Sequence, residues 1–303
     1  MWRRKTNCPS VMWGGMGDVV EIGIAVYTDG SYSDYVFSSG RMRLDHHQNA
    51  NVLRIARAFK AVKLALSDLR RFYERLESTP PGVKHLFPSP LAEPSWTGRM
   101  PRVTFTHRMS RSGELFITAT TEDERRSNIY VGTMSLSSGD EAEVVVKFTA
   151  EYNADAHHIL ARAGLAPTLH ACVPVCGGML MVVMDRVHGK MAWVAEQSSE
   201  LLPHTVYEDV KAAIDLLHHN GVVFGDLRTP NVMVLDRTSG DPPRLGAMLV
   251  DFDWAGKADE KRYPAVLNDG LDIWPPGADR GAIMRKEHDL YMLEQFKSLC
   301  HSA

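Results

Sequence analysis

Three side chains that offer oxygen ligands, Asp226, Asn231 and Asp251, flank two short apolar runs in the last part of the chain. The runs, 232–235 and 247–250, are separated by polar residues, a composition typical of a β-hairpin. Asp226 and Asn231 come just before the first run and Asp251 follows the second, so a hairpin would bring all three to one end of a small sheet. Carboxylate and amide oxygens suit Mg²⁺, which keeps phosphates as its other partners. The spacing therefore predicts a magnesium and phosphate site.

The stretch from 218 to 256 resembles the protein-kinase-like superfamily. In that family a loop with H-R-D or H-G-D precedes four residues and an Asn, and a hairpin leads on to D-F-G. Here the loop reads Gly-Asp-Leu-Arg-Thr-Pro-Asn, the hairpin turns at Ser239–Pro243, and the second motif is Asp-Phe-Asp-Trp-Ala-Gly. The sequence of these motifs is also similar to that of a group of fungal kinase-like proteins with HGDLR and DFDWAG motifs. The resemblance implies that Asp226 is the catalytic carboxylate and that Asn231 and Asp251 hold the metal ion.

Two more side chains near these motifs receive roles from the resemblance. Arg228 stands two residues past Asp226, where protein kinases usually carry Lys, and would offset charge on the transferred phosphoryl group. Asp253 replaces the Gly of D-F-G, a position where kinases of the aminoglycoside- and choline-kinase type often carry an acid. Residues i and i+2 of an extended segment share a face, so Asp253 is expected to share the divalent ion with Asp251.

The phosphates of ATP are expected to meet a lysine before this loop. The run 144–148 resembles the kinase strand that carries the phosphate-binding Lys, which makes Lys147 the candidate. A helix expected over 153–163 follows it, and in kinases this helix carries a Glu that pairs with the Lys. The available acids are Glu151, before the helix, and Asp155, within it. Asp155 is chosen, although it is one methylene shorter than the residue of the family.

The same resemblance assigns the adenine contacts and a support for the loop. The segment after the last expected strand resembles the hinge between two lobes, where backbone groups of Met184, Asp185 and Val187 would hold adenine. In a closing helix expected over 279–299, Asp289 is the candidate for the buried Asp that braces a kinase catalytic loop.

Several positions depart from the family pattern. The strands that should carry the glycine-rich phosphate lid contain only Gly113 and Gly132, and Phe224 replaces the His that usually supports the loop. Nothing after the second motif resembles A-P-E, so the C-terminal lobe is expected to be shortened, which makes a peptide acceptor less secure.

The chain before residue 101 is expected to form an accessory region. It predicts a hairpin with strands over 19–27 and 32–37, then an amphipathic helix over 50–76 whose apolar residues recur in steps of three and four. The apolar stripe consists of Val52, Ile55, Phe59, Val62, Leu66, Leu69, Tyr73 and Leu76. The basic residues on its other faces allow binding to nucleic acid, an acidic lipid surface or a coiled-coil partner. A solvated basic face on a helix packed within its own domain is the preferred interpretation.

Composition bounds the remaining possibilities. The formal net charge of −3 predicts no particular partner, and no apolar run approaches the ~20 residues of a membrane span. Four scattered cysteines and the absence of N-x-S/T sites fit an intracellular setting, cytoplasmic or nuclear. Six prolines between residues 78 and 101 indicate a linker, so we expect an accessory region over 1–100 and a kinase-like domain over 101–303, with lobes over 101–185 and 186–303.

The sequence thus predicts an α+β, two-lobed kinase-like fold with a shortened C-terminal lobe, preceded by a ββα region. The expected function is an ATP- and Mg²⁺-dependent phosphotransferase acting on a hydroxyl acceptor, a protein or a small molecule, which the sequence does not identify. The alternative is a pseudokinase that serves as a nucleotide-binding or partner-binding scaffold. A protein partner would use the N-terminal region, and nucleic acid is not expected as a partner.

Overall fold

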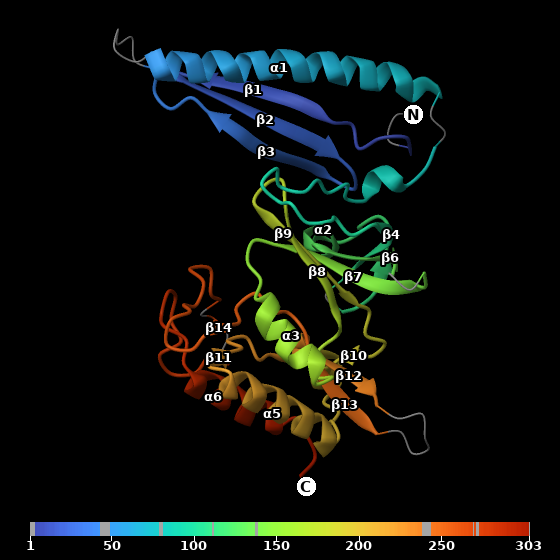
Figure 1. Ribbon diagram of the computed structural model, residues 1–303, viewed down its shortest axis with the longest axis vertical. Coiled ribbons are helices and arrows are strands. Elements are labelled where there is room, and N and C mark those ends of the chain that lie inside the picture. Colours follow the sequence, from blue (N-terminus) through green and yellow to red (C-terminus); the bar gives the residue numbers. More distant parts are fainter. Residues whose placement is uncertain are drawn as a thin grey trace. The chain divides into compact units, whose positions relative to one another are not determined.

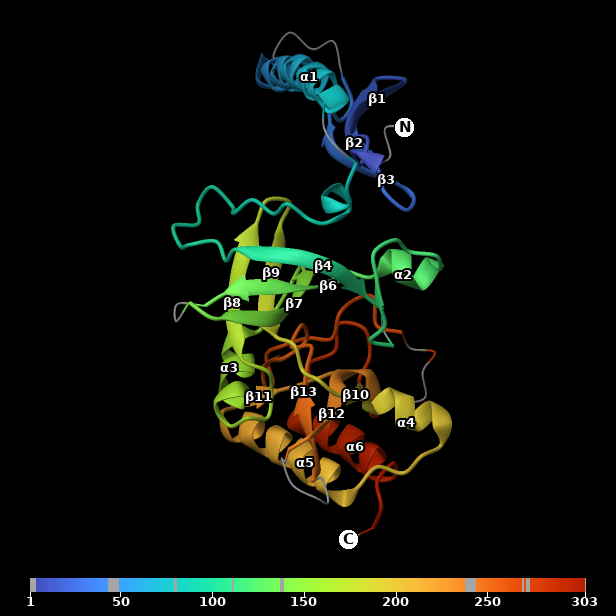
Figure 2. The same ribbon diagram turned by 90° about the vertical axis from the view of Figure 1, so that its right-hand side faces the viewer.

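The computed structural model shows a mixed α+β protein with several antiparallel sheets (Figures 1 and 2). It describes residues 4–42, 49–78, 81–110, 112–136, 139–237, 244–268, 270 and 273–302. The chain divides into two compact units, of which the first comprises Met1–Pro88 and Ile117–Arg125 and the second Ser89–Phe116 and Arg126–Ala303. Among the described residues, no helix is long and apolar enough to cross a membrane.

This division differs from a single boundary at residue 100, because two segments form hydrogen bonds with the unit on the other side of that boundary. The part of the proline-rich segment from Ser89 onward joins the second unit, where the Glu93 N–H donates to the Pro174 carbonyl at 3.0 Å. Residues 117–125 join the first unit, where the Ala119 N–H donates to the Asp29 carboxylate at 3.1 Å. Neither pairing leaves a periodic signal in the sequence.

The first unit is a three-stranded antiparallel sheet with one long helix. Its elements are β1 (Ser10–Met16), β2 (Val19–Tyr27), β3 (Ser31–Ser38), α1 (Asn49–Arg75), two 3₁₀ turns (Leu76–Ser78 and Lys84–Leu86) and α2 (Glu122–Arg126), which ends at the return to the second unit. The predicted hairpin and long helix are confirmed. The sequence analysis missed β1, which pairs with β2 along its whole length although its end is rich in glycine.

The side of α1 that is packed within its unit is narrower than the spacing predicted. Ile55 and Val62 are half-buried, whereas Val52, Phe59 and Leu66 are 63%, 44% and 52% exposed. These three residues recur every seven positions, along one flank of the helix. A straight helix on a small sheet is covered along one line only, so the predicted stripe is partly wrong.

The second unit begins with a six-stranded antiparallel sheet and one helix. In spatial order the strands are β5 (Leu115–Phe116), β4 (Val103–Met109), β6 (Ile129–Ser135), β7 (Glu141–Thr149), β9 (Met179–Asp185) and β8 (Leu169–Val175). The helix α3 (Ala154–Arg162) connects β7 to β8 and contacts both β8 and the later helix α5 (His204–His219). In Figure 1 it lies between the sheet and α5.

The rest of the second unit combines helices with short strands, and the predicted motifs lie next to two of these strands. Its other elements are β10 (Lys190–Met191), α4 (Ala192–Ser198), β11 (Val222–Val223), a 3₁₀ turn (Thr229–Asn231), β12 (Val232–Asp236), β13 (Leu245–Leu249), β14 (Gly256–Lys257) and α6 (Lys286–Lys297). The hairpin of β12 and β13 is confirmed, while its predicted turn, Ser239–Pro243, lies outside the described residues. One apolar cluster joins α3, α5, α6 and this hairpin, so the motif-bearing segments rest on a continuous core.

Candidate functional site

The hairpin brings the three predicted oxygen-bearing residues to the same end of a small sheet. Val232 is paired with Leu249, and the Val250 N–H donates to the Asn231 carbonyl at 2.9 Å. Asn231 and Asp251 therefore emerge side by side. The Asn231 amide nitrogen donates to the Asp226 carbonyl at 2.8 Å and to its Oδ2 at 2.9 Å, which joins the loop to the hairpin.

Lys147 on β7 meets the segment that follows β13. Its Nζ lies 2.7 Å from Asp251 Oδ1 and 2.8 Å from Asp253 Oδ2, and the residue is 8% exposed. Burial alone would lower the pKa of Lys147, but the two carboxylates outweigh it and raise this pKa. Burial would raise the pKa of Asp251, but Lys147 holds it below its ordinary value. Burial and the charge of Asp251 raise the pKa of Asp253 to about 6.

The backbone of Asp251 is in the left-handed region, with φ of 70°. A residue other than glycine keeps this conformation only where its surroundings enforce it. The next residue, Phe252, is fully buried, stacks on the His157 ring of α3 at 4.6 Å between centroids, and meets the edge of Phe224 at 5.6 Å. The buried phenylalanine thus anchors the strained residue that carries the carboxylate.

Asp226 is 6% exposed, and its carboxylate accepts hydrogen bonds from Arg228 and Asn231. Arg228 binds it through Nε to Oδ1 and through Nη2 to Oδ2, the latter at 2.7 Å. Burial raises the pKa of Asp226, and the hydrogen bonds and charge of Arg228 reduce but do not cancel that rise. The carboxyl is therefore more basic than an exposed aspartate.

Two tryptophans surround Arg228, and the sequence analysis gave a role to neither. The guanidinium carbon lies 5.9 Å from the Trp254 ring centroid and 5.5 Å from that of Trp274, and the two rings are stacked on each other. Such contacts hold a guanidinium by cation–π attraction. Trp254 is adjacent to the Asp-Phe-Asp motif and so offered a signal, whereas Trp274 comes from a loop with no periodic pattern.

The loop before Asp226 is supported by a buried carboxylate from α6. Asp289, with no exposed surface, accepts the backbone N–H of Phe224 and that of Gly225, both at 2.8 Å, and His218 Nε2 lies 2.9 Å from it. Gly225 has φ of 78°, and a Cβ there would lie 2.7 Å from the sulfur of Met284. Glycine is therefore required at this turn. The expected position of Asp289 under the loop is confirmed.

Asp155 does not pair with Lys147, and this prediction is wrong. It is exposed in the first turn of α3, one residue before the buried face that begins at Ala156. Successive residues of a helix are rotated by about 100°, so Asp155 points away when Ala156 points inward. The acid that accompanies Asp251 at the Lys147 ammonium is Asp253, which also accepts the Thr149 hydroxyl at 2.7 Å.

The structure contradicts the hinge prediction at Asp185, whereas the adenine contacts of Met184 and Val187 stay predictions. Met184 is buried in an apolar cluster of the sheet, and Val187 is half-buried just beyond β9. The Asp185 N–H donates to the Thr168 carbonyl at 2.9 Å and its carboxylate meets His170 Nε2 at 2.5 Å. Asp185 still lies within the strand, so its N–H is not available to adenine as predicted.

The connection from β4 to β6 is not a short glycine lid. It contains β5 and then passes through the first unit as residues 117–125 before it returns. A Cβ on Gly132 would lie 2.5 Å from the Thr104 carbonyl, so this glycine permits close strand packing.

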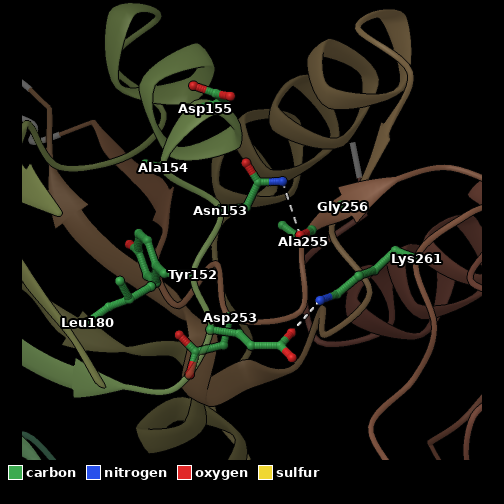
Figure 3. Close-up of a pocket in the computed structure, with 10 residues that line it drawn as sticks. Tyr152, Asn153, Ala154, Asp155, Leu180, Asp253, Ala255, Gly256 and Lys261 are labelled. Carbon is green, nitrogen blue, oxygen red and sulfur yellow. Dashed lines mark hydrogen bonds and ion pairs between the residues drawn. The ribbon is translucent and has the colours of Figure 1, made fainter. Parts of the chain in front are cut away.

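A pocket of about 560 Å³ lies beside the carboxylates, at the start of α3 (Figure 3). Its lining comes from residues 151–155 at the start of α3, from Leu180 of β9 and from the segment that begins at Asp253. Within it the Asn153 amide donates to the Ala255 carbonyl at 3.1 Å, and Lys261 forms an ion pair with Glu151 at 2.5 Å.

The oxygen atoms at the hairpin end are suitable ligands for a divalent cation. Asp253 Oδ1 is buried and has no hydrogen-bond partner among the described residues, and the Asn231 amide turns its nitrogen toward Asp226. That orientation leaves the amide oxygen of Asn231 for another contact. In the described part of the chain, no group of three His, Cys, Asp or Glu side chains is arranged for a metal, so the fit depends on the amide of Asn231.

No protein-family model matches the chain, and no curated protein matches its sequence. Among solved structures, the kinase PK-1 of Cydia pomonella granulovirus matches with a TM-score of 0.44 and 18% identity, over 64% of this chain and 68% of that chain. Because this identity and TM-score are low, the kinase-like interpretation rests on the geometry of the site and not on the match. Nothing in these comparisons supports the particular similarity to fungal proteins.

Proposed function

We propose that this protein is an ATP- and Mg²⁺-dependent phosphotransferase with a protein-kinase-like fold, which transfers the γ-phosphate to a hydroxyl acceptor. The observation that carries the proposal is the ion pair of the buried Lys147 with the half-buried Asp251, formed where Asp226 and Asn231 meet the same hairpin end. A residue with a strained backbone persists only where its surroundings enforce it, and phosphoryl transfer depends on carboxylates and a lysine placed in this way.

Each side chain then has a defined task. Lys147 would contact the nucleotide phosphates, and Asp251, Asp253 and the Asn231 oxygen would hold Mg²⁺. When bound, the ion neutralises charge on the phosphates. Asp226 would accept the hydroxyl proton. Its Oδ2 already receives two donors and its Oδ1 one, so the free lone pair that takes the proton is on Oδ1.

Arg228 would offset the charge of the transferred group. Its side chain is 31% exposed, and the tryptophan rings hold it beside Asp226. The acceptor, protein or small molecule, stays unspecified, and a protein partner of the first unit stays a prediction.

A second candidate is a pseudokinase that binds nucleotide or a partner without transfer. Two observations favour it: Arg228 and Asn231 occupy most of the acceptor sites of Asp226, and the β4–β6 connection is no glycine lid. A scaffold would need Lys147 and Asp251 for the nucleotide but would not need the Asp226 carboxylate.

Thermal unfolding with ATP, in the presence and absence of Mg²⁺, tests the proposed binding. At a concentration 100-fold above Kd, stabilisation should amount to about 2.7 kcal/mol, and Asp251→Ala should lose the Mg²⁺-dependent part. Transfer from labelled ATP to a protein extract and to a panel of hydroxyl compounds then separates the two candidates. Asp226→Asn should abolish transfer at unchanged ATP affinity. Equal transfer by variant and wild type would refute the catalytic role.

A further inference from the structure

One residue, Asn153, joins α3 to the segment that carries the two carboxylates. Its backbone N–H donates to the Phe252 carbonyl at 3.1 Å, and its side-chain nitrogen donates to the Ala255 carbonyl at 3.1 Å. Its Oδ1 accepts the Ala156 N–H at 2.9 Å and so caps the helix. The same side chain therefore begins the helix and binds the chain on the far side of Asp253 (Figure 3).

The bonds of Asn153 supply a connection that the ion pairs do not. Lys147 directs its ammonium to Asp251 and Asp253, so it fixes their segment to β7. The acid of α3, Asp155, is exposed and turned away. The position of α3 relative to the carboxylates is then held by Asn153 together with the packing of Phe252 on His157.

The two carbonyls bound by Asn153 stand on either side of Asp253, and Asp251 precedes them with its left-handed φ of 70°. A strained conformation persists where the neighbouring backbone is fixed. The Glu151–Lys261 ion pair joins the same two segments, but Glu151 is 70% exposed. Exposed pairs contribute little, so the bonds of Asn153 carry more of the restraint.

We propose that Asn153 is a positioning residue for Asp251 and Asp253, in place of an acid on α3. It holds their segment in the conformation in which both carboxylates face Lys147. The consequence for Mg²⁺ rests on the proposed function, whereas the restraint on the segment does not.

The test replaces Asn153 with two residues that keep the cap and lose the bond to Ala255. Asn153→Asp caps a helix as well as Asn does but has no N–H to donate. Asn153→Ser also caps, is too short to reach Ala255, and adds no charge near Asp253. The matched control is Asp155→Asn, in the same helical turn, whose side chain is exposed.

Amide hydrogen exchange of the full chain reads the restraint directly. Losing one bond of this kind should accelerate exchange across 251–256 about tenfold in both Asn153 variants, with α5 unchanged. The Asp155→Asn control should exchange like the wild type. Wild-type exchange in both variants, faster exchange throughout the chain, or the same change in the control would overturn the proposal.

Nucleotide binding separates positioning from a structural role. Both Asn153 variants should bind ATP without Mg²⁺ as the wild type does, and should need about tenfold more Mg²⁺ for the Mg²⁺-dependent gain. An equal loss with and without Mg²⁺ would contradict a role in positioning the carboxylates. If the wild type binds no Mg²⁺-ATP, the proposed function fails, while the exchange data still decide whether Asn153 restrains the segment.

Discussion

The loop of residues 224–231 forms the floor of the candidate site, and α3 forms its helix side. The two are held in place differently. The floor is held by a buried charge, because Asp289 accepts two loop N–H groups and contacts His218. The helix side is held by neutral groups, the amide of Asn153 and the stacked rings of His157 and Phe252. The floor is thus held by a carboxylate that accepts backbone N–H groups, and the helix side by an amide that donates to backbone carbonyls.

This difference shows which parts of a family pattern survive substitution. Phe224 replaces a histidine without disturbing the floor, because the bond to Asp289 comes from its backbone N–H. On the helix side the expected link needed a particular side chain, and with Asp155 turned outward the link is made elsewhere. Backbone-mediated contacts tolerate changes of residue type that contacts through side chains do not.

The largest effect should come from removing the charge under the floor. Asp289→Ala leaves two buried N–H groups without an acceptor, each worth ~1–3 kcal/mol, so the free energy of unfolding should fall by about 4 kcal/mol. Urea denaturation measures the fall. The control Glu287→Ala, exposed on the same helix, should change stability by less than about 0.5 kcal/mol. A loss under about 1 kcal/mol for Asp289→Ala would show that the floor does not depend on this charge.

The helix side should respond to acid. Burial lowers the pKa of His157 from 6.5 to about 4, although its bond to the Pro167 carbonyl opposes the change. Above pH 6.5 the ring is neutral in both states; between pH 6.5 and about 4 only the unfolded chain takes up the proton, so stability falls as pH falls. At about 1.4 kcal/mol per pKa unit, the loss should reach about 3 kcal/mol.

Unfolding measured at pH 7.5 and at pH 4.5 compares His157→Gln with His158→Gln, its exposed neighbour. Only the first should remove this part of the acid loss. Asp226 and Asp253, whose pKa values are raised, titrate alike in both variants and cancel in the difference. An identical pH dependence in the two variants would rule out the buried neutral histidine.

The smallest effect concerns the hydrogen bond between the end of β7 and Asp253. Thr149→Val keeps the shape of the side chain and removes the hydroxyl that donates to Asp253, which should cost about 1 kcal/mol. Thermal unfolding should place Thr104→Val, exposed on β4, within about 0.5 kcal/mol of the wild type. Greater stability in Thr149→Val would mean that the hydroxyl is not needed to hold Asp253.

Residue patterns were sufficient where contacts are local or follow a hairpin. Asp226, Asn231 and Asp251 come together because the pairing of β12 with β13 fixes their register, and that pairing is visible as two apolar runs. The outward turn of Asp155 also had a signal, since Ala156 and Leu160 mark the buried face of α3. The resemblance to kinases outweighed that signal.

Other features depend on contacts between distant segments and leave no periodic trace. Trp274 reaches Arg228 from a loop, and Ala119 bonds to Asp29 across much of the chain. Neither the apolar spacing nor a turn signal near these residues indicates the partner. Such pairings follow from tertiary packing and could not be read from the sequence.

The excursion of residues 117–125 has a consequence for the order in which the chain acquires structure during synthesis. Domains commonly fold as units, the N-terminal one first, while the chain is still emerging. Here the first unit lacks its last piece until residue 125 has been made, by which time β4 of the second unit is already complete. Synthesis of the second unit therefore begins before the first unit is complete, and no single cut in the chain separates one intact unit from the other.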